Sequence, residues 1–117
     1  VALVNKERSA AGCGPLAEDS LLNKAALGHS EDMAARDFFD HTNPDGEDPG
    51  QRITAAGYAW RTVGENIAAG YPSPQAVVDG WIASAGHCQN LMSPSFTQLG
   101  VGFYGANRWV QNFGTPL

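Results

Sequence analysis

The stretch LGVGFYGANRWVQNF, residues 99–113, decides the fold class of this chain. Leu99, Val101 and Phe103 alternate on one segment, and Trp109, Gln111 and Phe113 alternate on the next, the pattern of two strands. Gly105-Ala106-Asn107 between them predicts the turn of a hairpin. Helical patterns come before this hairpin, and helices followed by late strands indicate an α+β layered fold rather than a doubly wound one.

The helices are predicted from apolar residues that recur at three- and four-residue spacing. The longest pattern runs from about residue 17 to 38, and Gly28 inside it predicts close packing at that point. Residues 58–70 are expected to be extended or looped. Shorter helical segments are expected at about 1–11, 48–57, 73–86 and 87–92.

Length and composition limit the possible classes of protein. The 117 residues make one domain, and a hydrophobic content of 43% excludes a mainly disordered chain. The formal net charge is -5, so we expect no nucleic-acid partner, because phosphate binding needs a basic face. No apolar run approaches the ~18 residues of a membrane span, so no membrane insertion is expected. The chain begins at Val1 without an initiator methionine, as expected of a processed or trimmed protein.

The two cysteines, Cys13 and Cys88, allow two interpretations. Their wide separation excludes a C-x-x-C motif. They either form a disulfide, as in an exported protein, or remain buried thiols, as in a cytosolic one. Both lie in loop-like contexts, Gly12-Cys13-Gly14 and Gly86-His87-Cys88, which favours the disulfide.

Three polar residues lie where ligand-binding or catalytic groups concentrate. His41 and His87 are at breaks between predicted elements. Glu65 lies in an otherwise uncharged stretch, so its carboxylate is either tied to backbone amides or poised for proton transfer. The three residue types suit a zinc site with an open fourth position, although their spacing is non-local. His29, by contrast, lies on the apolar stripe of the long helix and is interpreted as structural.

Two short motifs resemble known functional motifs but lie outside the structural settings in which those motifs usually occur. Gly100, Gly102 and Gly105 match G-x-G-x-x-G, but inside a strand and with too little chain after them for a βαβ unit. We expect these glycines to let another element approach the sheet closely. Ser84 lies in half of a G-x-S-x-G motif at a helix end, which makes it a candidate nucleophile of a Ser84/His87/Glu65 hydrolase without the usual strand-to-helix setting.

Eight short motifs follow one another along nearly the whole chain. They are VNKER (4–8), HSEDMA (29–34), FDHTNPDG (39–46), RITAAGY (52–58), GENIA (64–68), WIASAGHCQN (81–90), LGVG (99–102) and WVQNF (109–113). In this order they resemble the CAP superfamily of cysteine-rich secretory proteins, antigen 5 and plant pathogenesis-related proteins, and above all its bacterial, SCP-like branch.

The resemblance implies one CAP domain over residues 1–117, folded as a three-layer α-β-α sandwich with a small, mostly antiparallel sheet. It also implies a cleft with two histidines and two glutamates, of which His41, Glu65 and His87 match three. The second glutamate is replaced, since the Trp-x-x-Glu of eukaryotic members is Trp81-Ile82-Ala83-Ser84 here. Zinc or another divalent metal at His41 and His87 is implied as well.

The resemblance also implies a secreted protein, extracellular or periplasmic. Cys13 and Cys88 resemble a disulfide of some bacterial relatives. The favoured function is a binding module, monomeric, for an apolar ligand, a peptide or a glycan. The alternatives are a metal-dependent hydrolase of peptides or other extracellular polymers with Glu65 as general base, and a purely structural polar cluster. The aromatic residues considered for a ligand groove are Tyr58, Trp60, Tyr71 and Trp81, with Trp81 expected in the core.

Overall fold

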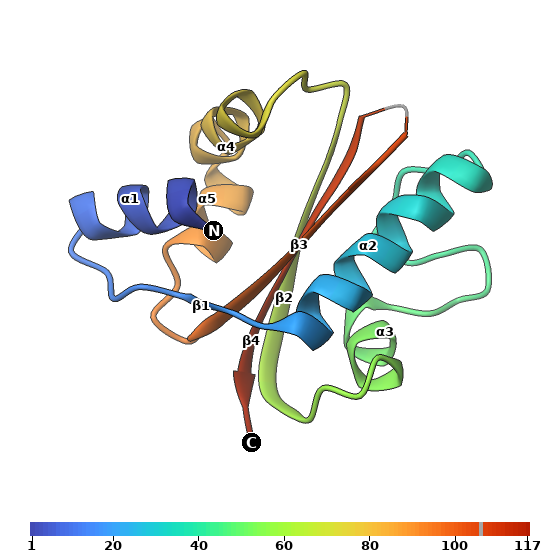
Figure 1. Cartoon of the computed structure of the whole chain (residues 1–117), viewed down its shortest axis with the longest axis horizontal. Coiled ribbons are helices and arrows are strands. Elements are labelled where there is room, and N and C mark those ends of the chain that lie inside the picture. The colour runs from blue at the N-terminus through green and yellow to red at the C-terminus, as the bar shows by residue number, and fades with distance from the viewer. Residues whose placement is uncertain (106) are drawn as a thin grey trace.

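The computed structural model describes residues 1–105 and 107–117, and Ala106 of the predicted hairpin turn lies outside them. Figure 1 shows helices on both sides of a central sheet. The elements are α1 (Ala2–Ala10), β1 (Ala17–Glu18), α2 (Ser20–Ala35), α3 (Pro49–Ala55), β2 (Trp60–Ala69), α4 (Pro74–Ala83), α5 (Ala85–Leu91), β3 (Gln98–Tyr104) and β4 (Arg108–Pro116).

The sheet has the strand order β1-β3-β4-β2. The predicted hairpin is present, with β3 and β4 antiparallel from Gln98 opposite Gly114 to Tyr104 opposite Arg108. Strand β2 pairs antiparallel with β4 on the other side, while the two-residue β1 pairs parallel with β3. The sheet is therefore mixed and mostly antiparallel, as expected.

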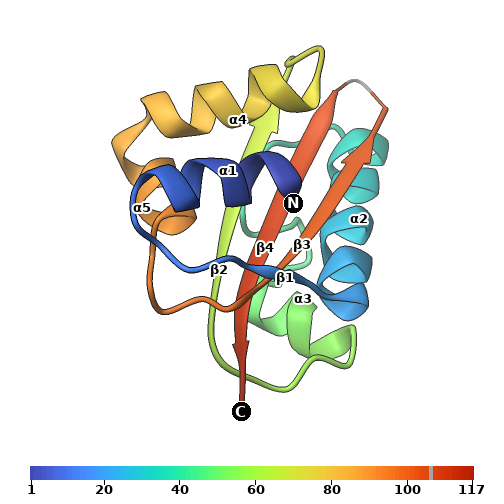
Figure 2. The ribbon, with the colours of Figure 1, turned by 60° about the vertical axis from the view of Figure 1, so that its left-hand side comes forward.

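Helices cover both faces of this sheet, which confirms the three-layer α-β-α sandwich. Helices α2 and α3 lie on one face, and α1, α4 and α5 lie on the other (Figures 1 and 2). The largest apolar cluster lies under α1, α4 and α5 and contains Trp81, Leu99 and Phe113. Two smaller clusters lie under α2 and α3, around Leu22 and Met33. No helix among the described residues is long and apolar enough to span a bilayer.

Short polar side chains fix the starts of three helices. The Asp19 carboxylate accepts from the Leu21 and Leu22 amides at the start of α2. Asp48 forms a capping box with Gln51 at α3, and Ser73 caps α4. Each such cap stabilises a helix by about 1 kcal/mol. Helix α2 starts later than the predicted residue 17, because Ala17 and Glu18 pair with β3.

The glycines of β3 let α2 approach the sheet, as predicted. A Cβ built on Gly100 or Gly102 would lie closer than 3.0 Å to backbone atoms of α2. Gly28 behaves differently, because nothing lies within 4 Å of a Cβ built there. The prediction of close packing at Gly28 is therefore wrong: this glycine is on the exposed face of α2.

The predicted disulfide is absent. Cys13 and Cys88 are both free thiols, and both are partly exposed. The Cys13 Sγ atom instead lies 3.4 Å from the Met92 carbonyl oxygen, just after α5. Cys88 is within α5, and its own carbonyl accepts from the Met92 amide. The loop after α1 is held to this segment by Arg8, whose guanidinium donates to the Leu91 carbonyl at 2.7 Å. A buried arginine therefore makes the connection that was predicted for the disulfide.

Candidate functional site

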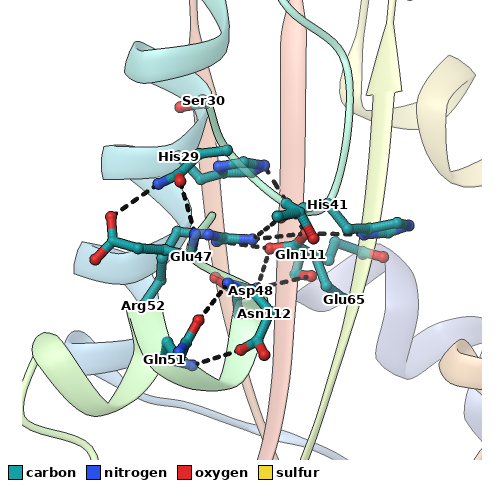
Figure 3. Close-up of polar contacts among 12 residues, drawn as sticks. His29, Ser30, His41, Glu47, Asp48, Gln51, Arg52, Glu65, Gln111 and Asn112 are labelled. Carbon is teal, nitrogen blue, oxygen red and sulfur yellow. Dashed lines mark hydrogen bonds and ion pairs between the residues drawn. The ribbon is translucent and has the colours of Figure 1, made fainter. Parts of the chain in front are cut away.

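The site is centred on the Glu65 carboxylate, which β2 places between the sheet and α3. Its side chain is only 1% exposed, so each oxygen needs a partner. Oε1 accepts from His41 Nδ1 at 2.9 Å, and Oε2 accepts from Asn112 Nδ2 on β4 at 2.8 Å. Arg52 on α3 donates to both oxygens, at 2.9 and 3.1 Å (Figure 3). Both oxygens are thus fully engaged.

Arg52 on α3 and Asn112 on β4 are partners of Glu65 that the sequence did not predict. Besides Glu65, the Arg52 guanidinium donates to the His41 carbonyl oxygen at 2.6 Å, so one side chain fixes both the carboxylate and the loop. Arg52 precedes the buried Ile53 in a helix of only seven residues. The one indication of a role for Arg52 was its position directly before a buried apolar residue.

The loop that carries His41 is also held from within. The predicted turn is present, with the Gly46 amide donating to the Asn43 carbonyl at 2.9 Å. The buried Asn43 side chain accepts from the Asp45 and Glu47 amides. The loop therefore places His41 beside Glu65 while its imidazole remains 49% exposed and accessible to a ligand.

His29 is structural, as predicted. Its side chain is fully buried, and Nε2 donates to the Asp40 carbonyl oxygen at 2.8 Å. Burial lowers the pKa of His29 in spite of the Glu65 charge 3.9 Å away. The ring is therefore neutral at pH 7, and it holds the start of the His41 loop against α2.

The Glu65–His41 pair favours its charged form. Burial alone would raise the pKa of Glu65, but hydrogen bonds from His41 and Arg52 outweigh it and lower the pKa. The same hydrogen bond from His41 to Glu65 raises the pKa of His41. Glu65 is consequently an anion at neutral pH and holds its negative charge against protonation.

His87 belongs to the same region but has a different partner. Its Nδ1 contacts the Ser84 hydroxyl, at 2.8 Å, rather than the Glu65 carboxylate. Asn66 on β2 donates to the His87 carbonyl at 3.1 Å, and Asn90 donates to the Glu65 carbonyl at 3.1 Å, so α5 is fixed to β2. Burial, and then the nearby His41, lower the pKa of His87. The structure thus brings Ser84 to His87, and His41 to Glu65.

Comparison with known proteins identifies the family of the chain. The sequence profile of the CAP, or cysteine-rich secretory protein, family matches residues 1–113. The chain belongs to the CAP family. This confirms the resemblance that the eight sequence motifs carry.

Several relatives of this CAP domain come from Bacillus species. It is 40% identical over 114 residues to the uncharacterized protein YkwD of Bacillus subtilis, covering 97% of this chain and 44% of YkwD. It is 34% identical over 111 residues to the uncharacterized membrane protein YlbC of the same organism, covering 95% of this chain and 32% of YlbC. An extracellular, SCP-domain-containing protein from Bacillus anthracis superposes with a TM-score of 0.93 at 38% identity, covering 96% of this chain and 37% of that one. The CAP domain therefore spans less than half of each of these relatives.

The geometry of this CAP domain fits the predicted three-residue zinc site poorly. Both Glu65 oxygens already accept hydrogen bonds, and among residues 1–105 and 107–117 no group of three or more His, Cys, Asp or Glu is placed to hold a metal ion. A metal at His41 and His87 stays a prediction from the sequence.

Two hollows follow one another along β2 of the CAP domain. An open groove of about 810 Å³ contains His41, Glu65 and Trp60, together with the N-terminal end of α3. A smaller hollow of about 280 Å³ contains Ser84, His87 and Tyr71. Trp60 and Tyr71 thus line hollows, as considered from the sequence. Tyr58 is 4% exposed and belongs to the core, and so does Trp81 at 3%, as expected.

Proposed function

We propose that this CAP domain is an extracellular binding module whose ligand occupies the open groove beside His41 and Trp60. The observation that carries the proposal is the saturation of Glu65 by Arg52, His41 and Asn112. A carboxylate that is ionised and fully hydrogen-bonded is a weak base, and its contacts hold His41 and Arg52 rigidly beside the groove. Rigid, pre-organised surfaces bind with little ordering cost.

The shape and lining of the groove favour an extended, uncharged ligand. The groove is wide and open, whereas sites for small molecules enclose most of the ligand. The Trp60 indole is anchored by a 2.9 Å hydrogen bond to Thr54, and its ring lies over Gly50. A fixed indole beside small and polar side chains suits a peptide segment or a glycan chain, which present alternating apolar and polar faces.

The proposed extracellular location rests on one relative and on composition. The Bacillus anthracis protein, 38% identical, is described as extracellular. A formal net charge of -5 suits a solvent-exposed module without a nucleic-acid partner.

The metal-dependent hydrolase considered from the sequence gains no such support. A hydrolase with a metal at His41 and His87 would need Glu65 as its general base. Arg52 and Asn112 donate hydrogen bonds to that carboxylate, and the hydrogen bonds from His41 and Arg52 lower its pKa, so that it takes up a proton less readily. The binding module is therefore the function that we favour.

We expect Trp60→Ala to weaken ligand binding at least tenfold, because interface aromatic residues carry a large share of binding energy. Calorimetric titration with neutral hexasaccharides and with uncharged ten-residue peptides measures the affinity. Tyr104→Ala is the matched control, since Tyr104 is 50% exposed but lies outside the groove. Equal affinity in wild type and Trp60→Ala, with both still folded, would contradict the proposed groove.

A further inference from the structure

We propose that Ser84 and His87 form a nucleophile–base pair that hydrolyses small, uncharged esters with an apolar acyl group. This activity goes beyond ligand binding in the Trp60 groove and does not depend on it. The proposal rests on the 2.8 Å contact between Ser84 Oγ and His87 Nδ1 and on the hollow that both residues line. A serine within hydrogen-bond reach of an imidazole is the arrangement that activates a hydroxyl nucleophile.

The position of Ser84 in the backbone frees its hydroxyl for this contact. Ser84 ends α4 and begins α5, with extended backbone angles (φ -100°, ψ 121°). A serine at a helix start commonly bonds the amides of the first turn. Here the side chain makes no capping hydrogen bond to α5 and bonds the imidazole three residues later instead. Its contact with His87 is therefore not explained as a helix cap.

The hollow beside the pair defines the class of substrate. Its volume is about 280 Å³, and apart from Ser84 and His87 its lining is apolar or aromatic: Phe39, Ile67, Ala68, Ala69, Tyr71, Gly80 and Trp81. Phe39 is 51% exposed at the rim, whereas Trp81 is buried at the base. An apolar wall with no charged side chain fits a short acyl chain and excludes charged acids.

The two histidines of the site have different partners, which supports separate roles. His87 contacts Ser84 and lines the apolar hollow, whereas His41 contacts Glu65 and lines the Trp60 groove. His87 is therefore the imidazole that is placed to take the Ser84 proton when a substrate occupies the hollow.

The reaction balances without a cofactor. Ser84 Oγ attacks the ester carbonyl carbon, and its proton moves to His87 Nδ1. The bond from that carbon to the alcohol oxygen then breaks, and the alcohol leaves with the proton from His87. Water next attacks the acyl-serine and gives its proton to His87, which returns it to Ser84 as the acid leaves.

The test is covalent labelling and turnover of the whole chain. A fluorophosphonate probe is expected to label Ser84, located by mass spectrometry, and p-nitrophenyl butyrate is expected to give a burst followed by turnover. Ser84→Ala should lose both the label and the turnover. His87→Gln should lower both rates by at least ~100-fold, the scale of general-base catalysis. Ser95→Ala is the matched control, because Ser95 is exposed and lies outside the hollow.

Each other outcome overturns the proposal. If Ser84→Ala only lowers the melting temperature and wild type is never labelled, the contact is structural. If turnover survives in Ser84→Ala but is lost with EDTA, a metal at the histidines performs the hydrolysis. The two proposals fail separately, because Ser84→Ala tests labelling and turnover, whereas Trp60→Ala tests ligand binding in the groove.

Discussion

Replacing Arg52 by methionine is expected to lower the free energy of unfolding by about 3–5 kcal/mol, the cost of leaving one member of a buried ion pair alone. Methionine keeps much of the side-chain length but removes the charge that lies 2.9 Å from Glu65. The carboxylate then retains only His41 and Asn112 as partners, while remaining 1% exposed. Urea denaturation at pH 7 measures the change.

A second variant tests whether the loss comes from the unpaired charge. Adding Glu65→Gln to Arg52→Met should restore part of the stability, because a buried amide costs less than a buried carboxylate. Arg36→Met is the matched control: Arg36 pairs with Asp32 at the surface of α2, where ion pairs contribute little. A loss no larger than that of Arg36→Met would contradict a central role for the Arg52–Glu65 pair.

The same pair has a defined pH dependence. Hydrogen bonds from His41 and Arg52 outweigh burial and hold the pKa of Glu65 below its ordinary value. A carboxyl with a lowered folded-state pKa stabilises the fold above its unfolded pKa of about 4.3, and this contribution is lost as the pH falls through the folded value. The difference between wild type and Arg52→Met should therefore shrink in acid.

The fold was predictable because it follows from periodic patterns and ordered motifs. The alternation at 99–103 and 109–113 gives β3 and β4, and the caps at Asp48 and Ser73 open α3 and α4. The parallel strand β1 was missed because two residues carry no periodicity. Pairing of so short a segment is decided by β3 beside it, not by its own sequence.

The site was predictable only in part, because its contacts are set by tertiary structure. Polar residues in unusual settings indicated His41, Glu65 and His87, and the first two are indeed in contact. The partners that complete Glu65 come from α3 and β4, 13 and 47 residues away along the chain. The sequence around Arg52 or Asn112 does not indicate that either residue contacts Glu65. The disulfide failed as a prediction for a related reason, since sequence spacing does not report where a thiol points.

Gly102→Ala is expected to destabilise the protein by about 3 kcal/mol or more, at or above the upper end of the usual cost of overpacking. The new Cβ would lie closer than 3.0 Å to the backbone of Ala26 and Leu27 in α2. Backbone of a helix that packs along β3 cannot move aside as a flexible side chain can. The variant should melt earlier by circular dichroism, and an unchanged melting temperature would contradict the close approach.

The spacing of the two glycines explains why α2 depends on them. Gly100 faces the backbone of Leu22 and Asn23, and Gly102 faces that of Ala26 and Leu27. One helical turn advances ~5.4 Å and two strand residues advance ~6.6 Å, so successive turns of α2 meet alternate residues of β3. Gly28→Ala provides the opposite control, because its Cβ would meet nothing within 4 Å. An alanine in that exposed helical position should stabilise the fold by up to ~1 kcal/mol, so the two substitutions, identical in chemistry, should shift the melting temperature in opposite directions.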